Sequence, residues 1–176
     1  MLDLVTGGAG FIGSHLVDQL LAQGHRVIVL DNFVTGRTEN LSQAIKNPQV
    51  TVYDIDICDA DGLSPYFDGV DRVFHLAALA DIVPSIQQPE NYLGVGVQGT
   101  ISVLQASVQA GVKRFLYAAS SSCYGIPDVY PTPETAVIRP QYPYALAKNL
   151  GEQCVMHWAK VYDLPAVSLR LFNVYG

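Results

Sequence analysis

A glycine-rich turn between an apolar segment and an amphipathic segment constrains the fold of this sequence more than any other feature. Leu4 and Val5 lead into glycines at positions 7, 10 and 13, and an amphipathic run begins at Phe11. Glycine permits a tight turn and a close backbone approach, and the first N–H groups of a following helix attract a pyrophosphate. The spacing is Gly-x-x-Gly-x-x-Gly rather than Gly-x-Gly-x-x-Gly, so a turn without a ligand is the alternative.

An acidic residue closes the next apolar segment. Asp31 follows residues 27–30, about twenty positions after the glycine turn. A carboxylate there accepts hydrogen bonds from an adenosine ribose and repels a 2′-phosphate, which favours NAD over NADP, although Arg37 could pair with such a phosphate. Past the third apolar segment, Asp56 and Ile57 could hold an adenine through its amino group and its ring. The alternative for Asp31 is that it only caps a loop.

Strand-like and helix-like patterns alternate along the whole chain. The expected strands are residues 4–6, 27–30, 50–53, 73–77, 115–118 and 166–172. The expected helices are residues 11–23, 41–45, 90–110 and 142–162. Alternation of this kind predicts an α/β domain of the Rossmann type, with a doubly wound parallel sheet of about six strands and right-handed crossovers. We expect residues 1–176 to form one such NAD-binding domain.

Composition narrows the class of partner. The chain has 176 residues, of which 49% are hydrophobic and 15% charged, and its net charge is −6. These values predict a globular domain and argue against binding to nucleic acid, which needs a basic surface. We expect no membrane span and no secretory signal, and therefore a cytoplasmic protein. The 3 cysteines form no Cys-x-x-Cys pair and the 4 histidines lack ligand spacing, so we expect no metal site.

A tyrosine and a lysine stand at helical spacing. Tyr144 and Lys148 are four residues apart, which places them on one helical face. A neighbouring ammonium group lowers the pKa of a phenol toward neutrality, as a general base for an alcohol requires. The run Ser120-Ser121-Ser122 follows the fifth expected strand and could offer a hydroxyl to the same cleft. Taken singly, the pair also fits an ordinary surface helix, and the serines fit an ordinary loop.

Five motifs in order identify a resemblance. They are residues 6–15 (TGGAGFIGSH), 75–78 (HLAA), 120–125 (SSSCYG), the pair Tyr144-x-x-x-Lys148, and residues 169–176 (LRLFNVYG). Over essentially its whole length, the chain resembles the N-terminal part of an extended short-chain dehydrogenase/reductase of the nucleotide-sugar epimerase/dehydratase type. The resemblance implies NAD as cofactor and a UDP-sugar as substrate.

The resemblance also implies roles for individual residues. Tyr144 would be the catalytic base, Lys148 its partner and Ser120 the third catalytic hydroxyl. The implied cofactor-binding residues are Gly7, Gly10, Phe11, Ile12, Gly13, Asp31, Asn32, Thr35, Gly36, Asp56, Ile57, Leu76, Ala77, Ala78, Ala80, Tyr144, Lys148 and Phe172. The implied substrate-binding residues are Ser85, Ser121, Ser122 and Asn173.

The serine run bears on the type of reaction. Related 4,6-dehydratases carry an Asp-Glu pair after the catalytic hydroxyl, whereas Ser121 and Ser122 stand there in this chain and cannot serve as an acid/base pair. The resemblance therefore implies 4-epimerisation of a UDP-hexose or UDP-N-acetylhexosamine, in which a hydride leaves C4 for NAD⁺, the 4-keto sugar rotates, and the hydride returns to the other face. Two alternatives stay open: a nucleotide-sugar reductase or dehydratase, and an NAD-binding fragment or partner-dependent subunit with little activity alone.

The chain departs from the family in two ways. Gly96 stands where the family usually has asparagine, which removes an amide near the active site and places a glycine in a helix. Family members also continue into a C-terminal substrate domain, so we expect this chain to be the cofactor half, truncated and without a separate substrate domain. In the family, the helices expected here at 90–110 and 142–162 pair across a homodimer as a four-helix bundle, and we expect the same pairing here.

Overall fold

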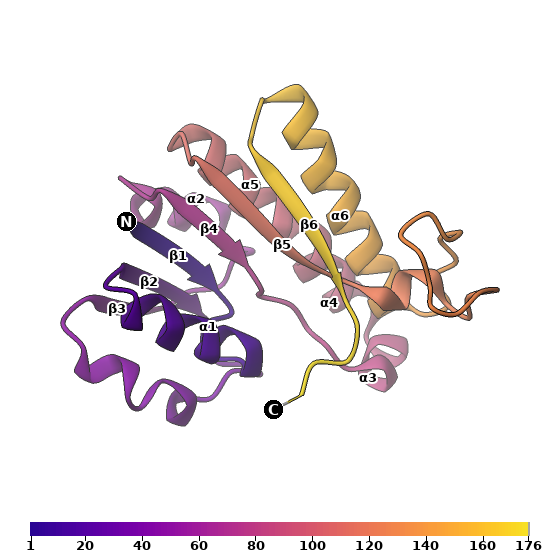
Figure 1. Cartoon of the computed structure of the whole chain (residues 1–176), viewed down its shortest axis with the longest axis horizontal. Helices are drawn as coiled ribbons and strands as arrows, with labels where there is room; N and C mark the ends of the chain where they lie inside the picture. Colours follow the sequence, from indigo (N-terminus) through magenta and orange to yellow (C-terminus); the bar gives the residue numbers. More distant parts are fainter. Residues whose placement is uncertain (176) are drawn as a thin grey trace.

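Residues 1–175 are described by a computed structural model, and they form one α/β domain built on a parallel sheet (Figure 1). Its six strands are β1 (Leu2–Thr6), β2 (Arg26–Asp31), β3 (Val50–Asp54), β4 (Arg72–His75), β5 (Arg114–Ser120) and β6 (Ala166–Leu171). The strand order is β3-β2-β1-β4-β5-β6, and every neighbouring pair is parallel. The order reverses between β1 and β4, which opens a crevice at the carboxyl ends of the strands. The predicted Rossmann-type sheet is confirmed.

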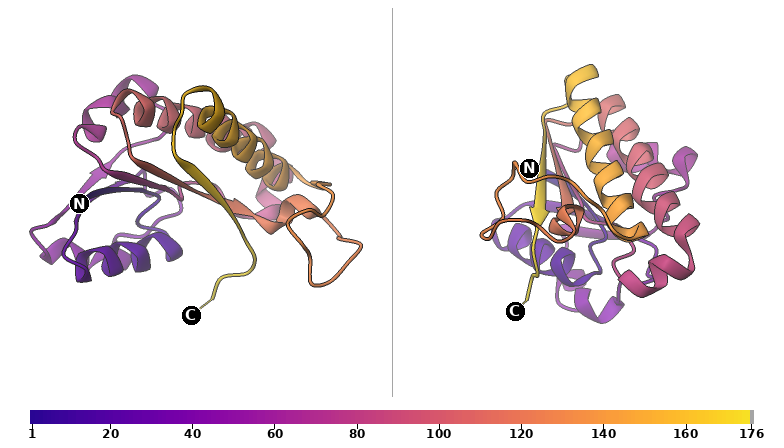
Figure 2. Two further views of the ribbon diagram at one scale, coloured as in Figure 1. Left: turned by 45° about the horizontal axis from the view of Figure 1, so that its top comes forward. Right: turned by 90° about the vertical axis from the view of Figure 1, so that its right-hand side faces the viewer.

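Helices cover the two faces of the sheet unequally (Figures 1 and 2). Helix α1 (Phe11–Ala22) lies on one face beside β1 and β2. The opposite face carries α2 (Ala60–Leu63), α4 (Pro89–Leu93), α5 (Thr100–Gln109) and α6 (Pro143–Val161), and the short α3 (Ile82–Gln87) contacts α4 and α6. No helix covers β6 on the α1 side within residues 1–175, and Leu169 is 46% exposed there.

Two predicted helices differ from the structure. Residues 41–45 were expected to form a short helix, but the chain makes two 3₁₀ turns instead, Thr38–Leu41 and Ala44–Lys46. Only Leu41 and Ala44 are buried in this stretch, which is too little packing to stabilise a regular α-helix of that length. The expected helix 90–110 is one helical run, but a π-helical turn, Gly94–Gly99, separates α4 from α5.

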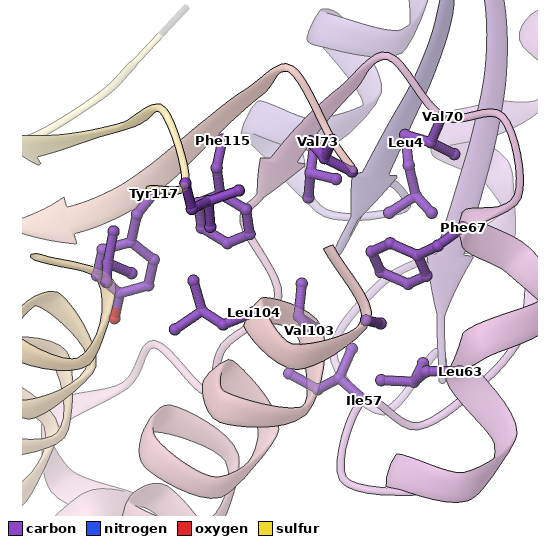
Figure 3. Close-up of a cluster of buried hydrophobic side chains, with 14 of the residues drawn as sticks. Leu4, Ile57, Leu63, Phe67, Val70, Val73, Val103, Leu104, Phe115 and Tyr117 are labelled. Carbon is purple, nitrogen blue, oxygen red and sulfur yellow. The ribbon is translucent and has the colours of Figure 1, made fainter. Parts of the chain in front are cut away.

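The core consists of two layers because alternate residues of each strand face opposite sides of the sheet. Leu4 of β1 packs with Val73, Phe115 and Tyr117 against Val103 and Leu104 of α5 (Figure 3). The next residue, Val5, packs on the other side, against α1, in a cluster that also contains Val17, Leu20, Val27 and Val29. Burial on both faces explains why β2 contains the continuous apolar run Val27–Leu30.

Among residues 1–175, no helix is both long enough and apolar enough to cross a membrane. In the same part of the chain, no three His, Cys, Asp or Glu side chains gather where a metal ion could be held.

Candidate active site

A cleft of about 860 Å³ lies at the carboxyl ends of the strands. Its walls come from the glycine turn, the ends of β2, β4 and β5, the 3₁₀ turn Ser121–Tyr124, the start of α6 and the residues after β6. Every residue predicted to bind the cofactor lines this cleft, and so do the predicted catalytic residues Ser120, Tyr144 and Lys148. The fold therefore gathers residues that are spread over most of the sequence into one cavity. Their binding and catalytic roles stay predictions.

The glycine turn is closed tightly enough to require glycine. Gly7 has a φ of +70°, and a Cβ atom there would lie 2.6 Å from the backbone nitrogen of Ala77. A Cβ atom at Gly13 would clash with the carbonyl oxygen of Gly7. Helix α1 begins directly after the turn, and no side chain caps its N-terminus. Its first N–H groups are therefore available to an anion in the cleft, which fits the pyrophosphate of a dinucleotide.

Asp31 caps a loop and also lines the cleft. Its carboxylate accepts hydrogen bonds from the N–H of Ala9 and the N–H of Phe33, both at 2.9 Å. Each carboxylate oxygen has a second lone pair, so these bonds leave acceptor capacity for a ribose. A Cβ atom at Gly36 would lie 2.7 Å from the Asp31 carboxylate, so only glycine leaves this side of it clear. Arg37 is exposed and does not line the cleft.

The predicted adenine pocket is held together by polar contacts. Asn32 donates to Asp56 through its side-chain amide at 3.1 Å, and the other Asp56 oxygen accepts from the N–H of Cys58 at 2.8 Å. Ile57 is buried in the core beside the cleft, where a Cβ atom at Gly99 would come within 2.7 Å of its Cδ1. The Asp56 carboxylate and the Ile57 side chain are thus fixed next to each other at the end of β3.

Lys148 is a buried ammonium group aimed at the end of β5. Its Nζ donates to the carbonyl oxygen of Ala118 at 2.7 Å and lies 5.1 Å from the centre of the Tyr117 ring. Burial lowers the pKa of Lys148 to about 8. Tyr144 stands one helical turn earlier on α6 and lines the cleft. The pair therefore reaches the cleft from one helix face, as the spacing predicted.

The serine run forms a small hydroxyl cluster at the end of β5. Ser120 accepts hydrogen bonds from the backbone N–H of Ser122 at 3.2 Å and from its hydroxyl at 2.8 Å. Because Ser120 acts as the acceptor in both, its own hydroxyl proton is free for another partner. Ser121, Ser122 and Asn173 also line the cleft. Ser85 does not, because it is fully buried and its hydroxyl donates to the carbonyl of Ile82.

A buried histidine that the sequence analysis did not assign to the site connects its parts. Thr100 donates to the Gly96 carbonyl at 2.8 Å, so it accepts from Nε2 of His75 at 3.0 Å, and Nδ1 accepts from the Thr6 hydroxyl at 2.7 Å. Burial, with a smaller contribution from the charge of Lys148, lowers the pKa of His75 to about 3, which keeps the ring neutral. Thr6 also accepts from the N–H groups of Leu76 and Ala77. The network ties the glycine turn to the π-helical turn.

A second cluster missed at the sequence level surrounds Arg170. Its guanidinium contacts the Glu152 carboxylate, the Tyr124 hydroxyl and the Glu134 carbonyl. In the sequence, Arg170 stands out only as part of the motif at residues 169–176, and no periodicity links it to these distant partners. Gly96 lies on the π-helical turn, and a Cβ atom there would be 2.9 Å from Cβ of Ala147 on α6.

Comparisons with known proteins agree with this geometry. Residues 4–176 match the NAD dependent epimerase/dehydratase family. A UDP-glucose 4-epimerase of Mycolicibacterium smegmatis is 41% identical over the whole chain, which spans 57% of that protein. A solved UDP-glucose 4-epimerase of Thermotoga maritima, with UDP-glucose, has a TM-score of 0.94 at 39% identity, and the chain covers 57% of it. A dTDP-glucose 4,6-dehydratase of Streptomyces venezuelae with NAD bound scores 0.93 at 36% identity, with 97% of this chain and 55% of that chain covered.

These matches confirm the predicted family and NAD as the cofactor of that family. The chain spans about half the length of the relatives that it matches. The structural neighbours include both epimerases and a dehydratase.

Proposed function

This chain belongs to the NAD-dependent epimerase/dehydratase family, and we propose that it is the cofactor-binding and catalytic part of a UDP-sugar 4-epimerase. One observation carries the choice of reaction. Among residues 1–175, the only carboxylates that line the cleft are Asp31 and Asp56, at the ends of β2 and β3. The wall near Tyr144 is lined by the hydroxyls of the serine run instead. Elimination of water needs an acid/base pair beside the sugar in addition to the base that accepts the proton of the 4-hydroxyl group. Epimerisation needs only that base.

NAD is held along the β1–β3 side of the cleft in this proposal. The N–H groups at the start of α1 bind the pyrophosphate, Asp31 accepts from the adenosine ribose, and Asp56 with Ile57 contacts the adenine. Lys148 reaches the nicotinamide ribose from α6. Bound in this way, NAD supplies a hydride acceptor and donor for C4 of the sugar.

The chain's own residues move the proton and hold the sugar. Tyr144 takes the proton from the 4-hydroxyl group and returns it after the sugar has turned over. Lys148, held by the Ala118 carbonyl, stabilises the phenolate of Tyr144 by its charge. Ser120 has a free hydroxyl proton with which it can donate to the same sugar oxygen. Ser121, Ser122 and Asn173 contact the remainder of the nucleotide sugar.

The proposal is tested by incubating the chain with NAD and each of UDP-glucose, UDP-galactose and their N-acetyl forms. We expect interconversion at C4 with no net accumulation of NADH, because the hydride returns to the sugar. In a parallel incubation with NADH in place of NAD, net consumption of NADH would identify a reductase, and a 4-keto-6-deoxy product in either incubation would identify a dehydratase. Either result contradicts the proposal. NAD affinity measured separately by titration shows whether the cofactor half works when turnover does not.

A second candidate function is an NAD-binding unit with little turnover of its own. It is favoured by the exposure of the sugar side of the cleft, where Tyr130 is 72% exposed. Water competes with every hydrogen bond in such an open site, which weakens catalysis. Tight NAD binding without epimerisation would support this candidate.

We also infer that the chain pairs with a second copy through α5 and α6. Leu146 and Met156 of α6 are 38% and 49% exposed, and contiguous exposed apolar surface is a mark of protein–protein association. Light scattering should give the mass of a dimer, and Leu146→Glu should lower it to that of one chain. A monomeric wild-type protein would contradict the pairing.

A further inference from the structure

Arg170 joins parts of the chain that are far apart in sequence. Its Nε donates to both oxygens of Glu152 on α6, at 3.1 and 3.0 Å. Its Nη1 donates to the Tyr124 hydroxyl at 2.8 Å and to the Glu134 carbonyl at 3.2 Å. The guanidinium carbon also lies 5.1 Å from the centre of the Tyr124 ring. One side chain on β6 therefore contacts α6, the 3₁₀ turn Ser121–Tyr124 (the serine turn) and the loop formed by residues 126–142.

The charge pair is sheltered from water. The side chains of Arg170 and Glu152 are 24% and 12% exposed, so solvent screens their attraction only in part. A second arginine, which lies on the loop 126–142 itself, offers a contrast: Arg139 and Asp128 form a pair at 3.0 Å, but their side chains are 50% and 70% exposed. Exposed pairs of that kind contribute little to stability. Of these two arginines, Arg170 is the one whose sheltered contact spans several segments.

The segments held by Arg170 form the sugar side of the cleft. Glu134 is attached through its carbonyl, and farther along the loop the N–H of Arg139 donates to the Cys123 carbonyl at 2.8 Å. Gly125, between the turn and the loop, has a φ of +62°, which favours glycine. The loop contributes Pro127, Tyr130 and Thr132 to the wall of the cleft, and the turn contributes the serines.

We propose that Arg170, together with Glu152, is a positioning pair for the sugar side of the cleft. The pair fixes the serine turn and the loop 126–142 against α6, so that the hydroxyls of Ser120–Ser122 face the side of the cleft to which α6 brings Tyr144. The role in sugar binding rests on the proposed function, but the attachment of the loop does not. A salt bridge that only stabilises the domain would affect both sides of the cleft equally.

The attachment of the loop 126–142 can be measured by proteolysis of the peptide bond after Glu134. A glutamate-specific protease cleaves after Glu134, whose carbonyl accepts from Arg170, and after Glu39, which lies far away in an exposed 3₁₀ turn. With Arg170→Met, we expect cleavage after Glu134 to rise about tenfold, the factor typical for losing a hydrogen bond to a charged group. Cleavage after Glu39 should stay unchanged. Arg139→Met is the matched control and should leave both rates unchanged.

Ligand binding supplies the second measurement. Arg170→Met should raise the Kd for UDP about tenfold and leave the Kd for NAD unchanged within about twofold. Arg170→Lys should recover only part of the effect, because one ammonium group cannot reproduce the planar donors of a guanidinium. The double variant Arg170→Met/Glu152→Gln guards against a half-buried carboxylate left unpaired, and it should behave like Arg170→Met.

Each outcome decides the proposal. Unchanged cleavage after Glu134, or equal rises after Glu39 and Glu134 with a parallel loss of NAD affinity, would overturn it. A wild-type chain that binds NAD but not UDP would count against the proposed function and against the sugar-binding part of this proposal, while the cleavage rates would still decide whether Arg170 attaches the loop.

Discussion

The two sides of the cleft are held by different kinds of contact. On the NAD side, the glycine turn touches the backbone after β4, and the buried Thr6–His75–Thr100 network lies behind it. On the sugar side, a loop and a 3₁₀ turn are attached through the side chain of Arg170. Backbone packing leaves almost no freedom to move, whereas a side-chain attachment can be weakened without unfolding the sheet. Adding an atom to the glycine turn should therefore weaken NAD binding. Removing the charge of Arg170 should loosen the loop on the sugar side.

The largest effect on the reaction rate is expected at Tyr144, the residue at which the NAD side and the sugar side of the cleft meet. Tyr144→Phe removes the phenolic oxygen that the proposed function uses as a base, and general acid–base catalysis contributes about 10²–10⁴-fold to a rate. We expect epimerisation to fall by this factor while NAD affinity stays nearly unchanged. Both are measured on the same preparation, by product analysis and by titration. An equal loss of both would mean that Tyr144 serves binding rather than catalysis.

A single methyl group added to the glycine turn should weaken NAD binding and lower the stability of the domain. Gly13→Ala places a Cβ against the carbonyl of Gly7 and 2.7 Å from Cα of Gly8, and neither backbone atom can move aside. Overpacking of this kind costs about 1–3 kcal/mol. We expect a lower thermal midpoint and a Kd for NAD at least about tenfold higher.

A glycine elsewhere provides the control for this change. Gly24 has a φ of +77° but open space around its Cβ position, so Gly24→Ala costs only the backbone strain of about 1–2 kcal/mol. It should lower stability without changing NAD affinity. If Gly24→Ala and Gly13→Ala lower NAD affinity equally, the effect is one of stability and the turn is not the binding site.

The ionisation of Lys148 should make both the stability of the domain and the rate of epimerisation depend on pH. Its pKa is lowered from 10.5 to about 8 by burial, so between these values the unfolded chain binds more protons than the folded one. Stability from this group therefore rises with pH over that range, with a limiting slope of about 1.4 kcal/mol per pH unit. Epimerisation should instead fall above pH 8, because the ammonium group loses its charge.

Other ionisable groups make stability fall as pH rises, so their contribution must be separated from that of Lys148. Burial raises the pKa of Cys58 to about 11 and raises the pKa values of Cys123 and Cys154, so these thiols lower stability as pH rises. The difference in urea unfolding between wild type and Lys148→Met isolates the lysine. A difference that does not change from pH 7 to pH 10 would contradict the lowered pKa.

Asp31 tests whether the NAD side also sets cofactor preference. Asp31→Ala removes the acceptor for the N–H groups of Ala9 and Phe33 and the negative charge near the ribose site. We expect the Kd for NAD to rise about tenfold, with a smaller change for NADP because the repulsion of its 2′-phosphate is lost. Asp31→Asn keeps an acceptor oxygen and separates charge from hydrogen bonding. If the preference between the cofactors stays unchanged, Asp31 is only a loop cap.

The same difference between the two sides explains what the sequence could predict. Buried parallel strands are continuous apolar runs, and the NAD side is built from glycines and an acid at fixed local spacing, so both could be recognised without a structure. The helix predicted at 142–162 agrees with α6 (Pro143–Val161). Asp31 shows the limit of local spacing, because the contacts that make it a loop cap as well appear only in three dimensions.

The sugar side depends on contacts that no local pattern reveals. Arg170 and Tyr124 are 46 positions apart, and nothing in their surroundings pairs them before the chain folds. Ser85 was placed near the substrate by its position in the sequence, but α3 turns its hydroxyl onto the Ile82 carbonyl and away from the cleft. The direction of a side chain on a short helix follows from packing, which a single sequence does not contain.

The smallest expected effect concerns Gly96, on the π-helical turn that packs against α6. Gly96→Ala gains about 1 kcal/mol of helix propensity. The new Cβ would lie 2.9 Å from Cβ of Ala147, one residue before Lys148, and overpacking costs about 1–3 kcal/mol. The gain offsets part of the cost, so we expect a net loss of stability of about 0–2 kcal/mol in urea unfolding. Epimerisation should fall more than stability does, because the contact displaces the helix that carries Tyr144 and Lys148. Ala147→Gly, which removes the opposing methyl group, should restore the rate in the double variant. A rate that stays low there would mean that position 96 acts on catalysis by some route other than its contact with α6.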